Sequence, residues 1–149
     1  MSRFSNKVTK KLLEAGWYPG RRVDIEQKFQ LIAESGYILT QIMMDFLIEF
    51  DGVSLTYSNG DNQFDFISYD VDFHPIQRVI RQGLVGDNVI PVGSFYNSNL
   101  LISITNNQSM CCYDEFENVY KIGDYYDEGI NFICMYGLNP YKYLESKII

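Results

Sequence analysis

The residues with the clearest capacity for chemistry are two aspartates and a histidine at alternating positions, Asp70, Asp72 and His74. On an extended backbone, alternate side chains project from the same face, so these three would converge there. Carboxylates and an imidazole can bind a metal, which would suit a metal-dependent hydrolase. His74 is the only histidine, however, and no second group of ligands supports such a site. Because Pro75 suits the first position of a helix, the segment is also explained as a helix entry with surface acids. We favour that second interpretation and expect no metal and no other cofactor.

The three cysteines, Cys111, Cys112 and Cys134, form neither a disulfide framework nor a zinc-binding spacing, because their number is odd and two are adjacent. Such thiols are typical of a reducing cytoplasm, and Cys134 is expected in the core. The roles of Cys111 and Cys112 stay open. There is also no Ser-His-Asp or Cys-His arrangement and no phosphate-binding glycine loop. The sequence therefore predicts a protein that is not an enzyme.

Aromatic and acidic residues gather between positions 113 and 128, where Lys121 is the only basic residue. In protein interfaces, aromatic rings serve as desolvated anchors, while carboxylates attract and pair with basic groups. Carboxylates could also imitate the phosphates of a nuclease substrate. The residues predicted to bind a partner are Asp114, Glu115, Phe116, Glu117, Asp124, Tyr125, Tyr126, Asp127 and Glu128.

Alternatives to this binding segment remain open. Its tyrosines could be packing residues of a sheet or core, and Asp124, Asp127 and Glu128 could simply stabilise the start of a helix. A different surface, the basic corner around Arg21 and Arg22, would instead suit an acidic partner.

The net charge of −7 is unevenly distributed. Residues 1–36 contain seven Lys or Arg and four Asp or Glu, whereas residues 37–149 contain five and fifteen. An acidic second part argues against binding to nucleic acid or to an anionic membrane. It suits a basic protein partner, because complementary fields speed encounter. A negative surface also aids solubility, so charge alone does not separate these interpretations.

A length of 149 residues predicts a single domain over residues 1–149. No run of eighteen apolar residues predicts a transmembrane helix, and the N-terminus lacks the apolar core of a secretory signal. We therefore expect a cytoplasmic protein. Its oligomeric state stays open.

A turn between two helices organises the first part of the chain. Apolar spacing predicts a helix that is capped by Ser5 or Asn6 and closed by Gly16, which can take the left-handed conformation. Trp17, the only tryptophan, follows at once, before the turn formed by Pro19-Gly20. We expect Trp17 to fill the core at this corner.

Two more helices are predicted before residue 51. Asp24, followed three residues later by Gln27, is typical of a capping box, and that helix should extend to about Ser35. Thr40 should cap a third helix that ends near Phe50. The apolar face of this third helix is broad, so we expect it to pack against a sheet.

The apolar period then changes from 3.6 to 2, which indicates strands. Pro91 interrupts one of them and implies either an edge position or a bulge. A short helix is predicted over 75–80, and a final one from Asp124 to about Tyr136. The predicted strands are 53–57, 64–66, 89–95, 100–105, 110–113 and 119–122. Helices followed by a meander and one more helix predict an α+β fold, with a mainly antiparallel sheet of about six strands and helices on one face.

Motifs along nearly the whole chain resemble one family. The first helix exit carries Leu12, Ala15, Gly16, Trp17, Pro19, Gly20, Arg21, Val23 and Asp24. Further motifs are Phe46-Leu47-Ile48-Glu49-Phe50-Asp51-Gly52-Val53, Phe64-Asp65-Phe66, Pro91-Val92-Gly93 and Val119-Tyr120-Lys121-Ile122. Together they resemble the third subfamily of the SUKH superfamily over about residues 10–138. The chain departs from its pattern at Asp51, where a glycine is common, and in the Asn- and Gly-rich loop at 58–63.

This resemblance implies a bacterial immunity protein that binds and neutralises a cognate toxin, often a nuclease, by stoichiometric occlusion. It implies no catalytic motif, and its matched residues do not locate the toxin-binding surface. The alternative is a regulatory or scaffold module of the same fold, and a metal-dependent hydrolase is the least supported interpretation.

Overall fold

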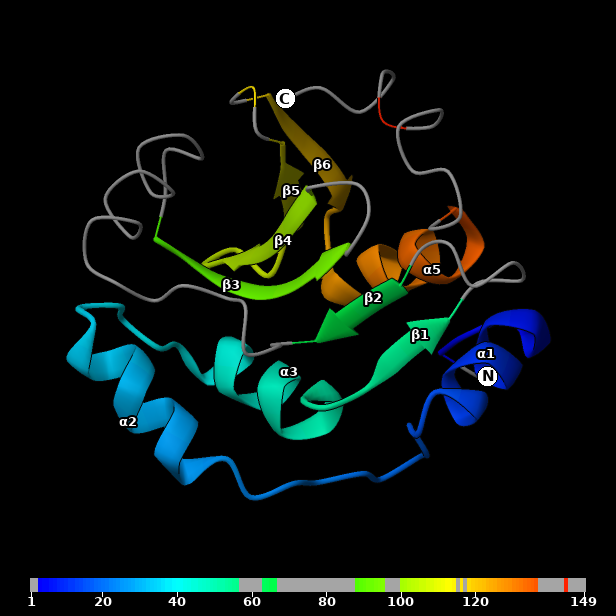
Figure 1. Cartoon of the computed structure of the whole chain (residues 1–149), viewed down its shortest axis with the longest axis horizontal. Helices are drawn as coiled ribbons and strands as arrows, with labels where there is room; N and C mark the ends of the chain where they lie inside the picture. Colours follow the sequence, from blue (N-terminus) through cyan, green and yellow to red (C-terminus); the bar gives the residue numbers. More distant parts are fainter. Residues whose placement is uncertain are drawn as a thin grey trace.

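The computed structural model describes residues 3–56, 63–66, 88–95, 100–114, 116, 118–136 and 144. The helices are α1 (Asn6–Glu14), α2 (Glu26–Glu34), α3 (Gln41–Phe50) and α5 (Tyr126–Tyr136) (Figure 1). The strands are β1 (Ser54–Thr56), β2 (Gln63–Phe66), β3 (Val89–Phe95), β4 (Leu100–Thr105), β5 (Met110–Tyr113) and β6 (Val119–Gly123). None of the helices in this described part is long and apolar enough to cross a membrane. The proposed ligands Asp70, Asp72 and His74 and the predicted helix 75–80 lie outside the described residues.

Each strand pairs antiparallel with its neighbour in the sequence, which gives one six-stranded meander in the order β1-β2-β3-β4-β5-β6. This confirms the predicted α+β fold. Pro91 lies in β3, which pairs with both β2 and β4 and is therefore no edge strand. The register shifts between Pro91 and Gly93. The bulge is thus the correct explanation of this proline, which has no backbone donor for a regular ladder.

The helices lie on one side of the sheet, and α3 forms the centre of the core (Figure 1). The broad apolar face of α3 is completely buried at Met43, Phe46, Leu47 and Phe50, as its sequence predicts. On the sheet, Leu100, Ile102 and Ile104 of β4 belong to the same core. Helix α5 packs on β5 and β6, and its Tyr126 ring contacts the Phe46 ring of α3, with centroids 5.3 Å apart.

Trp17 fills the corner between α1 and α3, as expected. Gly16, with φ of +102°, reverses the chain after α1, and the Trp17 amide then donates to Leu12 O over 3.0 Å. The indole stacks on Phe50 with centroids 6.4 Å apart, and Phe4 meets it edge-on at 5.7 Å. Only 5% of Trp17 is exposed.

Two predicted helix starts are confirmed and two are wrong. Ser5 accepts from the Val8 amide, and Thr40 accepts from the Met43 amide, both over 3.3 Å. Asp24 instead accepts from the Glu26 amide at 3.2 Å, a bond two residues along the chain that competes with a capping box. Helix α2 consequently begins at Glu26, with no side-chain cap. Helix α5 begins at Tyr126, two residues later than predicted.

Candidate functional site

The segment predicted to bind a partner is divided between the two ends of β6. Val119 at the start of β6 pairs with Tyr113, and Gly123 at its end pairs with Met110. A strand rises about 3.3 Å per residue, so the β5–β6 turn and the start of α5 are separated by roughly 16 Å. Residues close in the sequence therefore form two separate surfaces, which we call the turn surface (Asp114, Phe116 and Asn118) and the helix surface (124–128).

In the turn surface, the Asp114 carboxylate is buried and accepts hydrogen bonds from the residues around it. The residue is 5% exposed. Its Oδ1 accepts from the amides of Phe116 and Asn118, both at 3.0 Å. Its Oδ2 accepts from Asn118 Nδ2 and from the Tyr120 hydroxyl, both at 3.2 Å. Burial alone would raise the pKa of Asp114, but these hydrogen bonds together lower it below the usual value.

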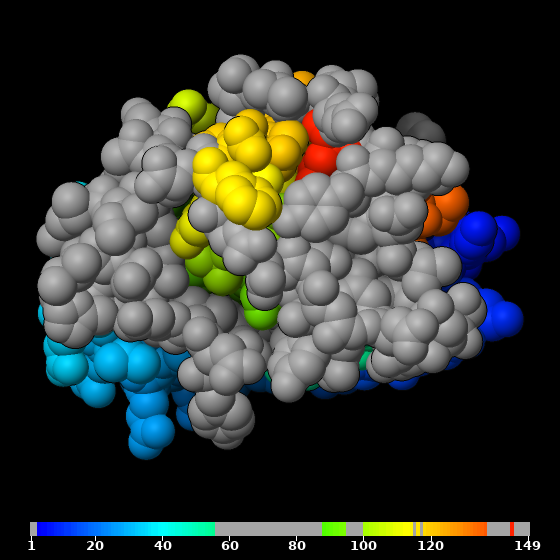
Figure 2. Space-filling view, turned by 45° about the horizontal axis from the view of Figure 1, so that its top comes forward, coloured from blue at the N-terminus to red at the C-terminus, as the bar shows by residue number. Residues whose placement is uncertain are grey.

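Phe116 projects from this turn with 75% of its surface exposed. Figure 2 shows that residues of this part of the chain, coloured yellow, reach the molecular surface. Glu115 and Glu117, which flank Phe116 in the sequence, lie outside the described residues.

In the helix surface, the predicted binding residues have different environments. Asp124, whose side chain is 76% exposed, forms an ion pair with Lys121. Tyr125 is 38% exposed and stacks on Tyr126, with ring centroids 4.6 Å apart. Tyr126 itself is buried, and burial raises the pKa of its hydroxyl. It is therefore a packing residue of the core, which was one of the open alternatives.

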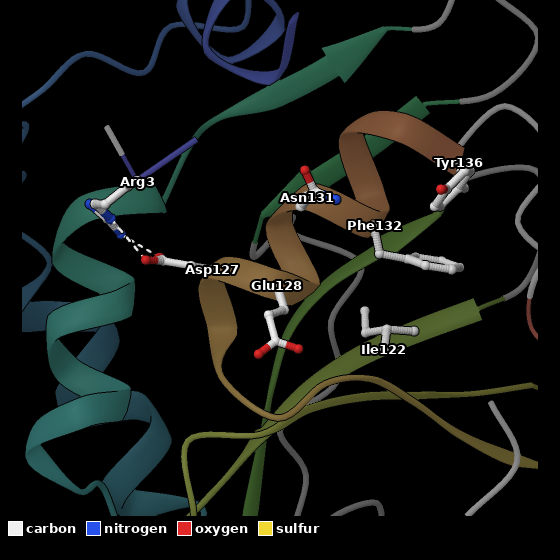
Figure 3. Close-up of a pocket in the computed structure, with 7 residues that line it drawn as sticks. All are labelled: Arg3, Ile122, Asp127, Glu128, Asn131, Phe132 and Tyr136. Carbon is white, nitrogen blue, oxygen red and sulfur yellow. Dashed lines mark hydrogen bonds and ion pairs between the residues drawn. The ribbon is translucent and has the colours of Figure 1, made fainter. Parts of the chain in front are cut away.

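Asp127 and Glu128 border a shallow hollow beside α5, of about 430 Å³ (Figure 3). Both oxygens of Asp127 accept from Arg3, over 3.0 and 2.6 Å. Glu128 is exposed, and its Oε2 accepts from the Asp124 amide at 3.4 Å, so it also closes the turn before α5. The hollow is further lined by Ile122, Asn131, Phe132 and Tyr136.

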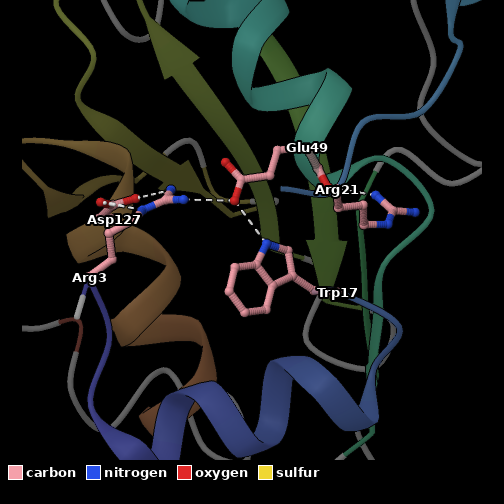
Figure 4. Close-up of polar contacts among 5 residues, drawn as sticks. All are labelled: Arg3, Trp17, Arg21, Glu49 and Asp127. Carbon is pink, nitrogen blue, oxygen red and sulfur yellow. Dashed lines mark hydrogen bonds and ion pairs between the residues drawn. The ribbon is translucent and has the colours of Figure 1, made fainter. Parts of the chain in front are cut away.

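Glu49 on α3 accepts hydrogen bonds from two other segments of the chain, a role that sequence reasoning missed. Its Oε2 accepts from Trp17 Nε1 and from Arg3 Nη1, each over 2.8 Å (Figure 4). Arg3 connects this carboxylate to Asp127, and the bonds to Asp127 and Glu49 raise the pKa of its guanidinium. A buried indole usually finds a partner for its N–H, so the lone tryptophan was a signal that an acceptor lies nearby.

Comparison with known proteins decides the family. The family model of SUKH-3 immunity proteins matches residues 4–136. The chain belongs to the SUKH-3 immunity protein family. No curated protein and no solved structure matches it.

Arg21 and Asp51, from two segments that resemble the family, have a structural role at the exit of α3. Arg21 donates to Glu49 O in the last turn of α3 at 2.6 Å (Figure 4) and to Asp51 O, just after the helix, at 2.7 Å. Its guanidinium thus binds carbonyls at the C-terminal end of α3. Asp51, where the sequence departs from the motif, accepts from Lys28 Nζ at 2.6 Å. Of the basic corner considered as an alternative binding surface, only Arg22 is exposed. The neighbouring guanidinium of Arg21 is already hydrogen-bonded to backbone carbonyls at the end of α3.

The described part of this SUKH-3 chain contains no group of His, Cys, Asp and Glu residues that could hold a metal ion. All three cysteines are buried, as predicted for Cys134. Desolvation raises the pKa of Cys111 and of Cys134 to about 12, and it raises that of Cys112 as well. Since the thiolate is the nucleophile, these thiols are unreactive at neutral pH.

Proposed function

We propose that this chain protects the cell that makes it by binding a cognate bacterial toxin and covering the toxin's working surface in a stoichiometric complex. The observation that carries the proposal is the family match over residues 4–136. The proposal needs no catalysis, and the buried thiols and hydrogen-bonded carboxylates of the described residues are consistent with that. We place the complex in the cytoplasm of the producing cell.

We further propose that the toxin presents a basic surface. Residues 37–149 contain fifteen acidic and only five basic residues. Of the predicted binding residues, Phe116, Asp124, Tyr125 and Glu128 are exposed in the structure. A negative surface would speed the approach of a basic toxin, and added salt would slow it. A nuclease would fit this description, because its substrate is an anion.

The test begins with the toxin encoded beside the gene of this chain. Expression of that toxin in a susceptible strain should stop growth, and co-expression of this chain should restore it. Titration calorimetry of the two purified proteins should give a 1:1 complex. Stopped-flow mixing should give an association rate constant that falls as salt rises from about 50 to about 500 mM. If the toxin still kills in the presence of this chain and no complex forms, the proposed function is wrong. A gene neighbourhood without any toxin would favour a regulatory module of the same fold.

A further inference from the structure

Phe116 is the most exposed large hydrophobic side chain among the described residues. Its exposed fraction is 75%, compared with 69% for Ile38 and 53% for Tyr18. Single exposed apolar residues are common on protein surfaces and need no explanation by themselves. What distinguishes Phe116 is the way in which its backbone is held.

The turn that carries Phe116 is fixed from beneath by the buried Asp114 carboxylate. The amides of Phe116 and Asn118 share Oδ1, and the Asp114 amide itself donates to Asn118 O at 3.1 Å. The Tyr120 hydroxyl holds the other oxygen from within the sheet. Each carboxylate oxygen therefore has two hydrogen-bond donors, which fix the backbone at Phe116 and Asn118 relative to the sheet.

An exposed aromatic ring on a backbone position that is held by a hydrogen bond has the properties of a binding anchor. Aromatic residues dominate the energetics of interfaces when they enter a partner's pocket. Fixing the backbone beforehand reduces the entropy that is lost on binding. On the helix surface, by contrast, Asp124 and Asp127 already have internal cationic partners, and Tyr125 already stacks on Tyr126.

The charge around Phe116 indicates the kind of partner. Glu115 and Glu117 flank it in the sequence, next to Asp114. A symmetric dimer through this turn would bring the same acidic residues of two copies together, which like-charge repulsion opposes. A protein pocket with an apolar floor and a basic rim would accept both the ring and its acidic neighbours.

We propose that Phe116 is the principal anchor of the toxin-binding surface, seated in an apolar pocket with a basic rim on the toxin, and that Asp114 is the positioning residue that presents it. This inference rests on the proposed function and adds to it the surface that makes the contact.

The experiment measures the Kd between the purified full chain and the toxin encoded beside its gene. We expect Phe116→Ala to weaken binding at least tenfold. Ile38→Ala is the matched control, because Ile38 is similarly exposed and lies at the opposite end of the sheet, where its carbonyl bonds to Asn88. It should change Kd less than twofold. Thermal unfolding of each variant checks that it is folded at the assay temperature.

A double-mutant cycle tests the role of Asp114. Asp114→Asn should weaken binding severalfold in the wild-type background and hardly at all in the Phe116→Ala background, because its effect passes through Phe116. An equal loss in both backgrounds would show that Asp114 does not act by presenting the ring.

Each remaining outcome contradicts a defined part of the proposal. If the wild-type chain binds the toxin and Phe116→Ala binds it equally well, the anchor is wrong while the proposed function stands. If the wild-type chain does not bind the toxin, the proposed function fails and the anchor with it. If sedimentation shows a dimer that Phe116→Ala abolishes, the ring serves self-association instead.

Discussion

The indole N–H of Trp17 donates to the Glu49 carboxylate across 2.8 Å, joining the α1 corner to the last turn of α3. The indole is 5% exposed, and the Glu49 side chain is 16% exposed. Water therefore has little access to replace either partner. The same carboxylate binds Arg3, which pairs with Asp127 on α5. Glu49 thus joins α3 to the corner after α1, and Arg3 joins α3 to α5.

Removal of the Glu49 carboxylate should destabilise the protein measurably. In Glu49→Ala the Trp17 N–H remains buried without its acceptor, which costs about 1–3 kcal/mol of unfolding free energy. Urea unfolding followed by fluorescence measures this directly, because Trp17 is the only tryptophan. Glu14→Ala, an exposed change at the end of α1, is the control and should stay within about 0.5 kcal/mol. Equal stability of the two variants would show that the Trp17–Glu49 bond contributes nothing.

Arg21 and Arg22 should respond differently to the same substitution. Arg21→Lys loses the paired donors that reach Glu49 O and Asp51 O, because an ammonium cannot reproduce the geometry of a guanidinium. A loss of about 1–2 kcal/mol would lower the Tm of a chain of this size by about 2–8 °C. Arg22→Lys, at an exposed neighbour, should leave the Tm unchanged. Calorimetric scans of both variants test the assignment, and a matching shift in Arg22→Lys would refute it.

Local rules of the chain were sufficient to predict most elements. Ser5 and Thr40 cap their helices as predicted, because a cap depends on residues only three positions apart. The sequence left two explanations for a proline in the strand 89–95, an edge position or a bulge. The choice depends on whether β3 has a neighbouring strand on both sides, which local sequence does not tell. The assignment of one domain to residues 1–149 stays a prediction.

The candidate site was less predictable, because it depends on contacts that are distant in sequence. Glu49 lies 32 residues from Trp17, and nothing local in the sequence joins them. Asp114 was predicted as a partner-binding residue, as part of one acidic and aromatic run. In the structure Asp114 is buried, and the pairing of β5 with β6 places Asp114 and Asp124 at opposite ends of β6. Which of the predicted binding residues touch a toxin stays a prediction.

Gly129 of α5 lies directly against Met110 of β5, and a larger residue there should be harmful. An added Cβ would lie 2.8 Å from Met110 Cβ and 2.9 Å from its Cγ, and Met110 is completely buried. In Gly129→Ala the helix must move away from the strand, which we expect to cost about 1–3 kcal/mol despite the better helix propensity of alanine. Asn131→Ala, an exposed position of the same helix, should be neutral or slightly stabilising. Chemical unfolding of both variants provides the comparison, and a stabilised Gly129→Ala would show that the packing is looser than described.

The buried Asp114 carboxylate should make part of the stability dependent on pH. Its pKa in the folded state is lower than the ordinary value of 3.8, so the ionised form binds the turn more tightly than the protonated form. The stabilisation is therefore complete at pH values well above 3.8 and is lost as the pH falls through the lower, folded-state pKa.

Asp114→Asn removes this charge while keeping the shape of the side chain. At pH 7 it should lower the unfolding free energy by about 1.5–3 kcal/mol, the range for hydrogen bonds to a charged group. The difference from the wild type should shrink as the pH falls below about 4, because the unfolded wild-type chain is protonated first, and should be lost once the pH is below the folded-state pKa. Asp124→Asn, at an exposed carboxylate on the other end of β6, should show only a small difference at any pH. Urea titrations between pH 7 and pH 2.5 measure all three proteins, and a constant gap for Asp114→Asn would mean that the ionised form is not what holds the turn.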